Sequence, residues 1–148
     1  MTAHHYPTDE VLGALAASTD DTPVVMVNLN RYRDRAEYPA DTPEAGLGLS
    51  GREAYLRYGI VAHAAITSVG GRILWAADAN EVVIGCEHDR YDEIIAVWYP
   101  NRAAFLTLAA HPGYPESHVH RDAGVEQAML LAVDAEAEPV LRNPFDPV

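Results

Sequence analysis

The sequence predicts an α+β domain built on one four-stranded antiparallel sheet, and the order of its elements is the main reason. An apolar strand over residues 23–32 is followed by a capped helix, two further strands, a second helix over 101–110 and a last strand over 127–133. With 148 residues and 49% hydrophobic content, the chain is long enough for one domain with a substantial core. This βαββαβ order is typical of a ferredoxin-like fold, with the helices on one face of the sheet.

An extension is expected at each end of this core. Thr8 can cap a short N-terminal helix because Asp9 and Glu10 place negative charge in its first turn. The C-terminal segment contains three prolines, which do not suit a central strand, so we expect an arm that lies on the domain or on a partner. The whole chain, 1–148, is therefore one domain with three parts: the N-terminal extension 1–22, the ferredoxin-like core 23–133 and the C-terminal arm 134–148.

The first strand and the first core helix have the clearest signals. The run from Val24 to Leu29 is too continuously apolar for a half-exposed strand, so both of its faces are expected to be covered. After a long loop, Ser50 and Glu53 form a capping box, in which each side chain can satisfy a backbone donor of the other. Gly70-Gly71 then supplies the left-handed stop at the end of the helix.

The middle of the chain offers three strand-like segments: 72–77, 82–86 and 93–99. The first two are joined by a turn-prone stretch and predict a hairpin. Since the sheet needs only two strands here, one of the three segments is expected to be short or irregular. The single cysteine, Cys86, ends the second segment and is expected to be a buried structural thiol.

Charge and motifs narrow the function classes. Ten basic against 22 acidic residues give a net charge of −12, which disfavours nucleic acid and anionic membranes as partners. No apolar run approaches the roughly 20 residues of a membrane span, and no signal pattern begins the chain, so a cytoplasmic location is expected. Dinucleotide-loop, phosphate-loop and paired-cysteine motifs are missing, so we expect no cofactor.

Several short motifs in order resemble a known bacterial family, the domain of unknown function 1330 family. The motifs cover roughly 23–133 and are Val25-Met26-Val27-Asn28-Leu29, Ala54-Tyr55-Leu56-Arg57-Tyr58-Gly59, Gly70-Gly71-Arg72-Ile73-Leu74-Trp75, Tyr99-Pro100-Asn101-Arg102, Phe105 and Pro112-Gly113-Tyr114. The resemblance implies a homodimer of the dimeric α+β barrel superfamily, with a pocket between sheet and helices in each subunit. It implies no single activity, because similar folds include monooxygenases, isomerases, cyclases, dehydratases and haem-binding enzymes.

Histidines are the natural proton-transfer groups for chemistry without a cofactor, because they titrate near neutral pH. The densest polar segment, 111–122, holds three of them, although a solvated connection between helix and strand is the competing interpretation. A metal site at His118-x-His120 lacks a clear third ligand. The candidate catalytic residues are His63, His111, His118 and His120.

Polar and aromatic residues are candidates for substrate binding. Asn28 interrupts the most apolar strand and must either organise the core or face a ligand. Aromatic residues suit a planar ligand but equally suit a core or a dimer interface, and arginines that could bind an anion are ordinarily solvated. The candidates are Asn28, Tyr58, Trp75, Trp98, Arg102, Tyr114 and Arg121.

The leading functional hypothesis is a small dimeric enzyme that binds an aromatic or polyketide-like metabolite. Histidine acid–base chemistry would carry out cyclisation, isomerisation, dehydration or direct oxygenation without a cofactor. The first alternative is a noncatalytic ligand-binding or assembly protein of the same fold, and the second is a haem or metal protein. Histidines that converge on one cavity would favour the enzyme, and scattered histidines would favour the first alternative.

Overall fold

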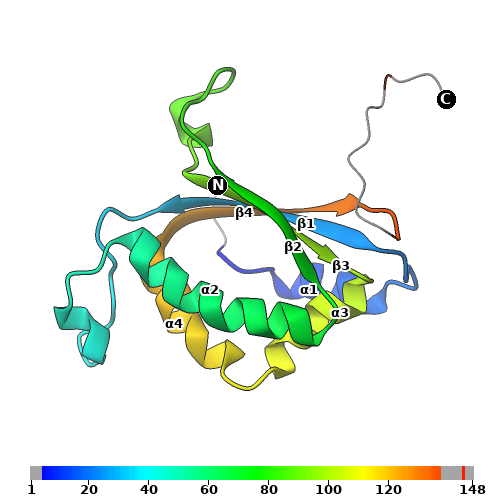
Figure 1. Ribbon diagram of the computed structural model, residues 1–148, viewed down its shortest axis with the longest axis horizontal. Helices are drawn as coiled ribbons and strands as arrows, with labels where there is room; N and C mark the ends of the chain where they lie inside the picture. The colour runs from blue at the N-terminus through cyan, green and yellow to red at the C-terminus, as the bar shows by residue number, and fades with distance from the viewer. Residues whose placement is uncertain (1–4, 138–144, 146–148) are drawn as a thin grey trace.

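A four-stranded antiparallel sheet forms one layer of the molecule, and helices cover one of its faces (Figure 1). The computed structural model describes residues 5–137 and 145. Its helices and strands are α1 (Asp9–Ala17), β1 (Val24–Tyr32), α2 (Gly51–Ser68), β2 (Arg72–Asp78), β3 (Glu93–Tyr99), α3 (Arg102–Leu106), α4 (Tyr114–Gly124) and β4 (Val125–Asp134). Three short 3-10 helices lie at Pro43–Gly46, Glu87–Asp89 and Thr107–Ala110.

The strand order is β2-β3-β1-β4, and every neighbouring pair is antiparallel. The two central strands are therefore the first and third in the chain, as the ferredoxin-like arrangement requires. The predicted α+β fold is confirmed, together with the N-terminal helix that Thr8 caps by accepting a hydrogen bond from the Val11 backbone. The predicted C-terminal arm lies for the most part outside the described residues.

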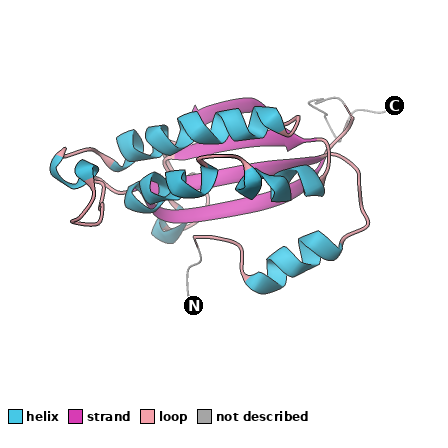
Figure 2. Ribbon diagram, turned by 90° about the horizontal axis from the view of Figure 1, so that it is seen from below, coloured by secondary structure: helices cyan, strands magenta, loops and turns pink. Residues whose placement is uncertain are grey.

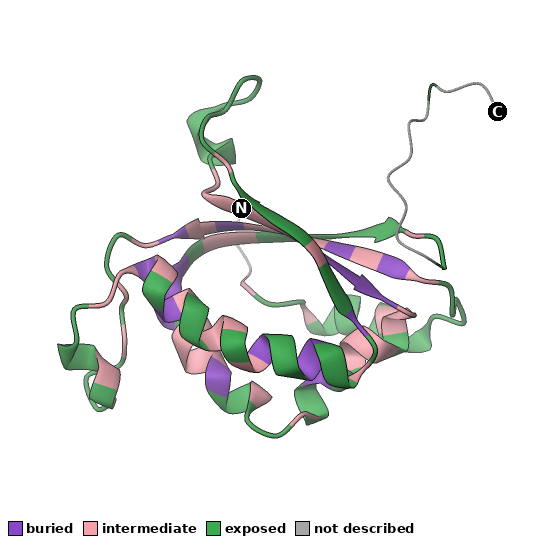
Figure 3. Ribbon diagram, viewed as in Figure 1, coloured by how far each residue is buried: buried purple, intermediate pink, exposed green. Residues whose placement is uncertain are grey.

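The core lies between the sheet and α2. Alternate side chains of β1, Val24 and Met26, pack with Ala65 and Ile66 of α2 and with Val97 of β3. Figure 3 shows buried residues along β1, β3 and α2. Because strand side chains alternate between faces, the intervening residues of β1 point to the other face. No helix covers that face among the described residues, so the expectation that both faces of β1 are covered is not met by this chain alone.

Two glycines let α2 and α4 approach each other at the level of the backbone. The Gly51 N–H donates to the Arg33 carbonyl over 3.0 Å, and the Arg33 N–H donates to the Gly124 carbonyl over 2.8 Å. A β-carbon on Gly51 would lie 2.6 Å from the Gly124 carbonyl oxygen, closer than real β-carbons approach other atoms. This contact places α2 beside α4 under the sheet (Figure 2).

Three predictions need correction. Residues 82–86 form no strand: they belong to the loop 79–92, which joins β2 to β3 and rises on the side of the sheet away from the helices (Figure 1). Cys86 is accordingly exposed and is not a buried thiol. The second helix that packs on α2 is α4, whereas the predicted helix 101–110 is the short α3 continued by a 3-10 turn.

No helix in the described part of the chain is both long enough and apolar enough to cross a bilayer.

Candidate functional site

Four aromatic side chains from three parts of the chain meet on the helical side of the molecule. Tyr114 and His118 are one turn apart on α4 and so share a face, and their ring centroids are 4.8 Å apart. Tyr58 of α2 lies 5.8 Å from the His118 ring, and Tyr6, from the segment before α1, lies 5.3 Å from it. The Tyr58 and Tyr114 hydroxyl oxygens are 3.1 Å apart and share a hydrogen bond. We call these four residues the His118 cluster.

The environment of His118 favours its neutral form. Partial burial lowers the pKa of the imidazole below its ordinary value of 6.5, the nearby Arg121 charge lowers it further, and Asp122 opposes both. Neither ring nitrogen of His118 hydrogen bonds to the part of the chain that the structure describes. A neutral imidazole with an unengaged nitrogen is able to accept a proton from a bound molecule.

Tyr6 closes the outer side of this cluster. Its hydroxyl donates a short hydrogen bond to the Asp122 carboxylate. The Arg121 guanidinium lies over its ring, 4.7 Å from the centroid, and donates a 2.7 Å hydrogen bond to the His5 carbonyl. Burial and the Asp122 carboxylate raise the pKa of Tyr6 to about 12, so its hydroxyl keeps its proton at neutral pH.

A row of tyrosine rings connects the cluster to the sheet. Tyr32 of β1 lies 5.2 Å from Tyr55, and Tyr55 lies 5.3 Å from Tyr58, both on α2. Burial raises the pKa of all three hydroxyls, so none of them is ionised at neutral pH. At the inner end, Asn30 is 2% exposed, and its side chain partly offsets the raised pKa of the Tyr32 and Tyr55 hydroxyls. The inner end of the row is therefore a buried polar group beside two tyrosine hydroxyls.

The other three candidate histidines do not join this cluster. His63 is exposed on α2. His111, which follows the last 3-10 helix, lies beside the C-terminal end of α2, and its Nδ1 is 3.3 Å from the Ser68 hydroxyl. The Nδ1 of His120 lies 2.7 Å from the Tyr38 hydroxyl. His118 and His120 thus point to different partners, as expected for residues two apart on a helix. The histidines are scattered, and one of them occupies the aromatic cluster.

The remaining binding candidates divide between the two faces of the sheet. Of these, Tyr58, Tyr114 and Arg121 belong to or border the His118 cluster, whereas Asn28 uses its amide to donate to the Ile95 carbonyl over 3.2 Å. Trp75 and Trp98 lie on the face of the sheet that no helix covers, because their register partners Ala96 and Val25 point there. Arg102 donates to Asp20 over 3.2 Å and so links α3 to the end of the N-terminal extension.

Sequence reasoning missed three residues of this region: Tyr6, Asp122 and Asn30. Tyr6 belongs to an extension that carries no motif, and Asp122 ends the polar segment 111–122 but is not among the candidate residues. Asn30 had a usable signal, since it follows Val24, Met26 and Asn28 at a spacing of two and must share their face.

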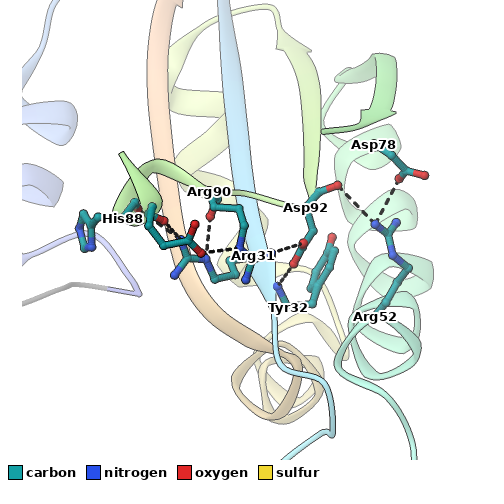
Figure 4. A network of polar contacts seen from close by, with 8 residues as sticks. Arg31, Tyr32, Arg52, Asp78, His88, Arg90 and Asp92 are labelled. Atoms are coloured by element: carbon teal, nitrogen blue, oxygen red, sulfur yellow. Dashed lines mark hydrogen bonds and ion pairs between the residues drawn. The ribbon is translucent and has the colours of Figure 1, made fainter. Parts of the chain in front are cut away.

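Apart from the His118 cluster, a polar cleft lies at the edge of the sheet near the start of α2 (Figure 4). It has a volume of about 380 Å³, and Arg52 and Asp78 are among its lining residues. Arg52 is paired with Asp78 at 3.1 Å and with Glu93 at 3.2 Å, and it lies 5.0 Å from the centre of the Tyr32 ring. Its charge is thus engaged within the protein. None of the predicted site residues lines this cleft.

The described residues contain no group of three or more histidine, cysteine or acidic side chains arranged to hold a metal ion. No family model matches the chain, and no curated protein matches it either. The expected membership of the domain of unknown function 1330 family therefore rests on its short motifs alone.

Two crystal structures are similar to the chain along most of its length. One is a structure of methylated RPA0582 protein, which is 31% identical over 99% of this chain and 100% of that chain, with a TM-score of 0.81. The other describes RPA0582 as a protein of unknown function from Rhodopseudomonas palustris, with 32% identity over 90% of this chain and 97% of that chain and a TM-score of 0.78. The shared fold and this identity over almost the whole chain show that the protein belongs to the family of RPA0582.

Proposed function

We propose that the protein binds an aromatic small molecule at the His118 cluster and transfers a proton there, with His118 as the base. The observation that carries this proposal is the state of His118: partly buried among three tyrosine rings, with a lowered pKa and no hydrogen bond to either nitrogen within the described chain. A base that is neutral at physiological pH and close to aromatic surfaces suits proton abstraction from a planar substrate.

The neighbouring hydroxyls suit the charge that such a step creates. When a carbon acid loses its proton to His118, negative charge develops on the substrate oxygen or nitrogen to which the carbon is conjugated. Tyr58 and Tyr114 share one hydrogen bond, so one of their two hydroxyl protons is free to donate to that atom. Burial raises the pKa of Tyr58, so this hydroxyl stays protonated and able to donate. The proton taken by His118 can then return to another atom of the substrate, as isomerisation requires.

A chromogenic model reaction tests this base. In nitrobenzisoxazole, removal of the ring C–H proton forms a nitrile, breaks the N–O bond and leaves a coloured cyanophenolate. We expect His118→Ala to slow the protein-catalysed ring opening by about a hundredfold, the lower end of what general acid–base catalysis contributes. His120→Ala is the matched control, since His120 lies on the same helix but its Nδ1 is hydrogen bonded to the Tyr38 hydroxyl. Equal rates in the wild type and in His118→Ala would contradict the proposal.

A noncatalytic binding protein is the second candidate, and the scatter of the histidines favours it. His63, His111 and His120 lie apart from the cluster, so His118 would have to act without a second histidine to return the proton. In that case the cluster would hold an aromatic ligand through ring contacts and hydroxyls alone. A ligand that binds at the cluster and is recovered chemically unchanged would support this alternative.

The uncovered face of the sheet suggests a homodimer. Residues paired directly across strands share a face, so Leu131 of β4 lies there beside Val27, and Met129 lies there beside Leu29. Leu131 is 48% exposed, and Trp75 and Met129 are also exposed. An apolar sheet face of this kind is a typical protein interface. A second copy placed face to face would cover it, as the resemblance to the dimeric α+β barrel superfamily implies.

A further inference from the structure

The side chain of Tyr6 makes every type of contact that a free phenol would need. Its hydroxyl donates to the Asp122 carboxylate, one ring contact is with the Arg121 guanidinium at 4.7 Å, and another is with the His118 ring at 5.3 Å. A carboxylate acceptor, a cation over the ring and an aromatic neighbour together recognise a neutral phenol through both its hydroxyl and its π system.

The partners of Tyr6 all belong to α4, which is part of the folded core. Ser117, Ala123 and Gly124 of α4 are buried, and the helix packs along α2. Arg121 and Asp122 therefore keep their backbone positions whether or not Tyr6 is present. The core therefore provides the residues that surround this position, and the N-terminal extension provides the Tyr6 side chain that occupies it.

The extension itself is weakly attached. No residue of α1 is buried, and its packing is against the short α3. Apart from Tyr6, the polar links between the described part of the extension and the core are the hydrogen bond from Arg121 to the His5 carbonyl and the ion pair from Arg102 to Asp20. Segments with few buried apolar contacts open at low free-energy cost. The Tyr6 side chain can thus leave while the core remains folded.

We propose that Tyr6 is an internal stand-in for a phenolic ligand, and that the position it fills beside His118, Arg121 and Asp122 is a phenol-binding site that the N-terminal strap, residues 5–7, keeps closed. This inference rests on the proposed function for the nature of the site and adds the class of its ligand. A phenol bound in place of Tyr6 would lie against the unengaged nitrogens of His118. Its hydroxyl would donate to Asp122, as that of Tyr6 does.

Calorimetric titration of the full chain with para-cresol tests this proposal. We expect Tyr6→Ala to bind para-cresol about tenfold more tightly than the wild type, as for a strap that keeps the site closed about 90% of the time. Tyr6→Phe keeps the ring but loses the Asp122 bond, so its affinity is expected to lie between the two. Para-methylanisole has no hydroxyl proton to donate, so we expect Tyr6→Ala to bind it no more tightly than the wild type does.

Two controls separate this site from a simple cavity. Tyr38→Ala removes another tyrosine that is bonded to a histidine of α4, and it is expected to leave para-cresol affinity unchanged. Asp122→Ala in the Tyr6→Ala background is expected to abolish the preference for para-cresol over para-methylanisole. Equal gains in Tyr6→Ala and Tyr38→Ala, or no gain in Tyr6→Ala, would overturn the proposal and leave Tyr6 as an anchor of the extension.

A thermal melt shows whether the Tyr6→Ala variant is folded and whether its folded state binds para-cresol. Para-cresol at a fixed concentration is expected to raise the melting temperature of Tyr6→Ala more than that of the wild type, because a ligand stabilises the state that binds it.

The two proposals can also be tested independently of each other. Cresol binding by Tyr6→Ala together with full ring opening by His118→Ala would remove the proton-transfer function and keep the phenol site. The opposite pair of results would remove the phenol site and keep the base.

Discussion

His118 is the candidate histidine that combines partial burial with ring nitrogens that have no partner in the described chain. Nδ1 of His111 and Nδ1 of His120 are engaged by the hydroxyls of Ser68 and Tyr38, and His63 is exposed. Aromatic rings around His118 supply burial without hydrogen bonds. This combination disfavours the charged imidazolium and leaves a base that a ligand can reach, and none of it is visible from the spacing of histidines in the sequence.

Titration of His118 by NMR provides the first prediction at the residue scale. In the wild type its midpoint is expected below 6.5, because burial among Tyr6, Tyr58 and Tyr114 outweighs the attraction of Asp122. The unfolded chain then binds this proton more readily than the folded chain does. The stability that neutral His118 contributes is therefore present above pH 6.5 and is lost as the pH falls through the folded-state pKa.

Removal of Tyr6 should move this midpoint in a known direction. Tyr6→Ala exposes the imidazole on one side, and since burial is the largest cause of the lowered pKa, the midpoint is expected to rise toward 6.5. Arg121 and Asp122, the charged neighbours, are unchanged in this variant. A wild-type midpoint at or above 6.5, or no upward movement in Tyr6→Ala, would contradict this account of the site.

At the scale of elements, the crossing of α2 and α4 positions the two halves of the cluster. Tyr58 is carried by α2, and Tyr114 and His118 by α4, so their contacts depend on how closely the helices approach. Gly51 and Gly124 allow that approach by bringing two backbones together. The sequence predicted where α2 begins, from Ser50 and Glu53, but it gave no sign that Gly124 is the partner of Gly51.

Substitution of Gly124 tests this crossing. A β-carbon there would lie 2.3 Å from the Gly51 carbonyl oxygen, so Gly124→Ala is expected to lower the free energy of unfolding by about 3 kcal/mol, the upper range for overpacking. Gly59→Ala is the matched control in the interior of α2. Apart from the neighbouring backbone of its own helix, no described atom lies within 4 Å of the added carbon, so this change is expected to stabilise the protein by about 0.5–1 kcal/mol. Denaturant unfolding measures both, and similar values for the two would contradict the close crossing.

The loop 79–92 shows how tertiary contacts overrode a strand-like pattern. Arg31, from the uncovered face of β1, donates to the carbonyls of Glu87, His88 and Arg90 over 2.9, 3.3 and 2.6 Å (Figure 4). Gln127 of β4 adds a 3.3 Å hydrogen bond to the His88 carbonyl. These bonds attach residues 87–90 of the loop to the sheet, while the apolar tip of the loop remains in solvent, with Ile84 95% exposed.

At the scale of the whole molecule, the two faces of the sheet differ in what covers them. One face is covered by α2 and α4, and the other carries exposed apolar side chains of β2 and β4 (Figure 3). Trp98, also on this second face, is partly covered by the chain after β4, because its indole N–H donates to the Glu136 carbonyl over 3.1 Å. The continuously apolar sequence of β1 predicted cover on both faces, and a partner subunit would provide the missing cover.

Sedimentation of a charged variant tests the proposed dimer. Leu131→Glu places a carboxylate on the uncovered face, midway along the edge strand β4, and burying two such charges against each other would cost far more than the lost apolar contact. We expect the wild type to sediment as a dimer and the variant as a monomer. Ile60→Glu is the matched control, since Ile60 is 75% exposed on α2 and should leave the dimer intact. A monomeric wild type, or dimers in both variants, would contradict the proposed interface.

The sequence by itself determined the elements whose signals are local. Ser50 and Glu53 begin α2, Gly70 ends it with a φ of 82°, and the apolar run from Val24 marks a central strand. Caps, stops and side-chain periodicity act within a few residues, so they can be read without knowledge of the fold. The order of these elements was then sufficient to predict the ferredoxin-like sheet.

Only the tertiary structure decided which polar residues meet. Tyr6 and Asp122 are separated by 116 positions, yet their side chains are hydrogen bonded, and Tyr58 reaches Tyr114 across two helices. The same holds for Arg31, whose hydrogen bonds reach the loop carbonyls of Glu87 and Arg90 from the distant strand β1. Such contacts depend on how helices cross and where extensions fold back, and no local pattern encodes either. The sequence therefore predicted the fold and several members of the site, and packing selected His118 from among the histidines.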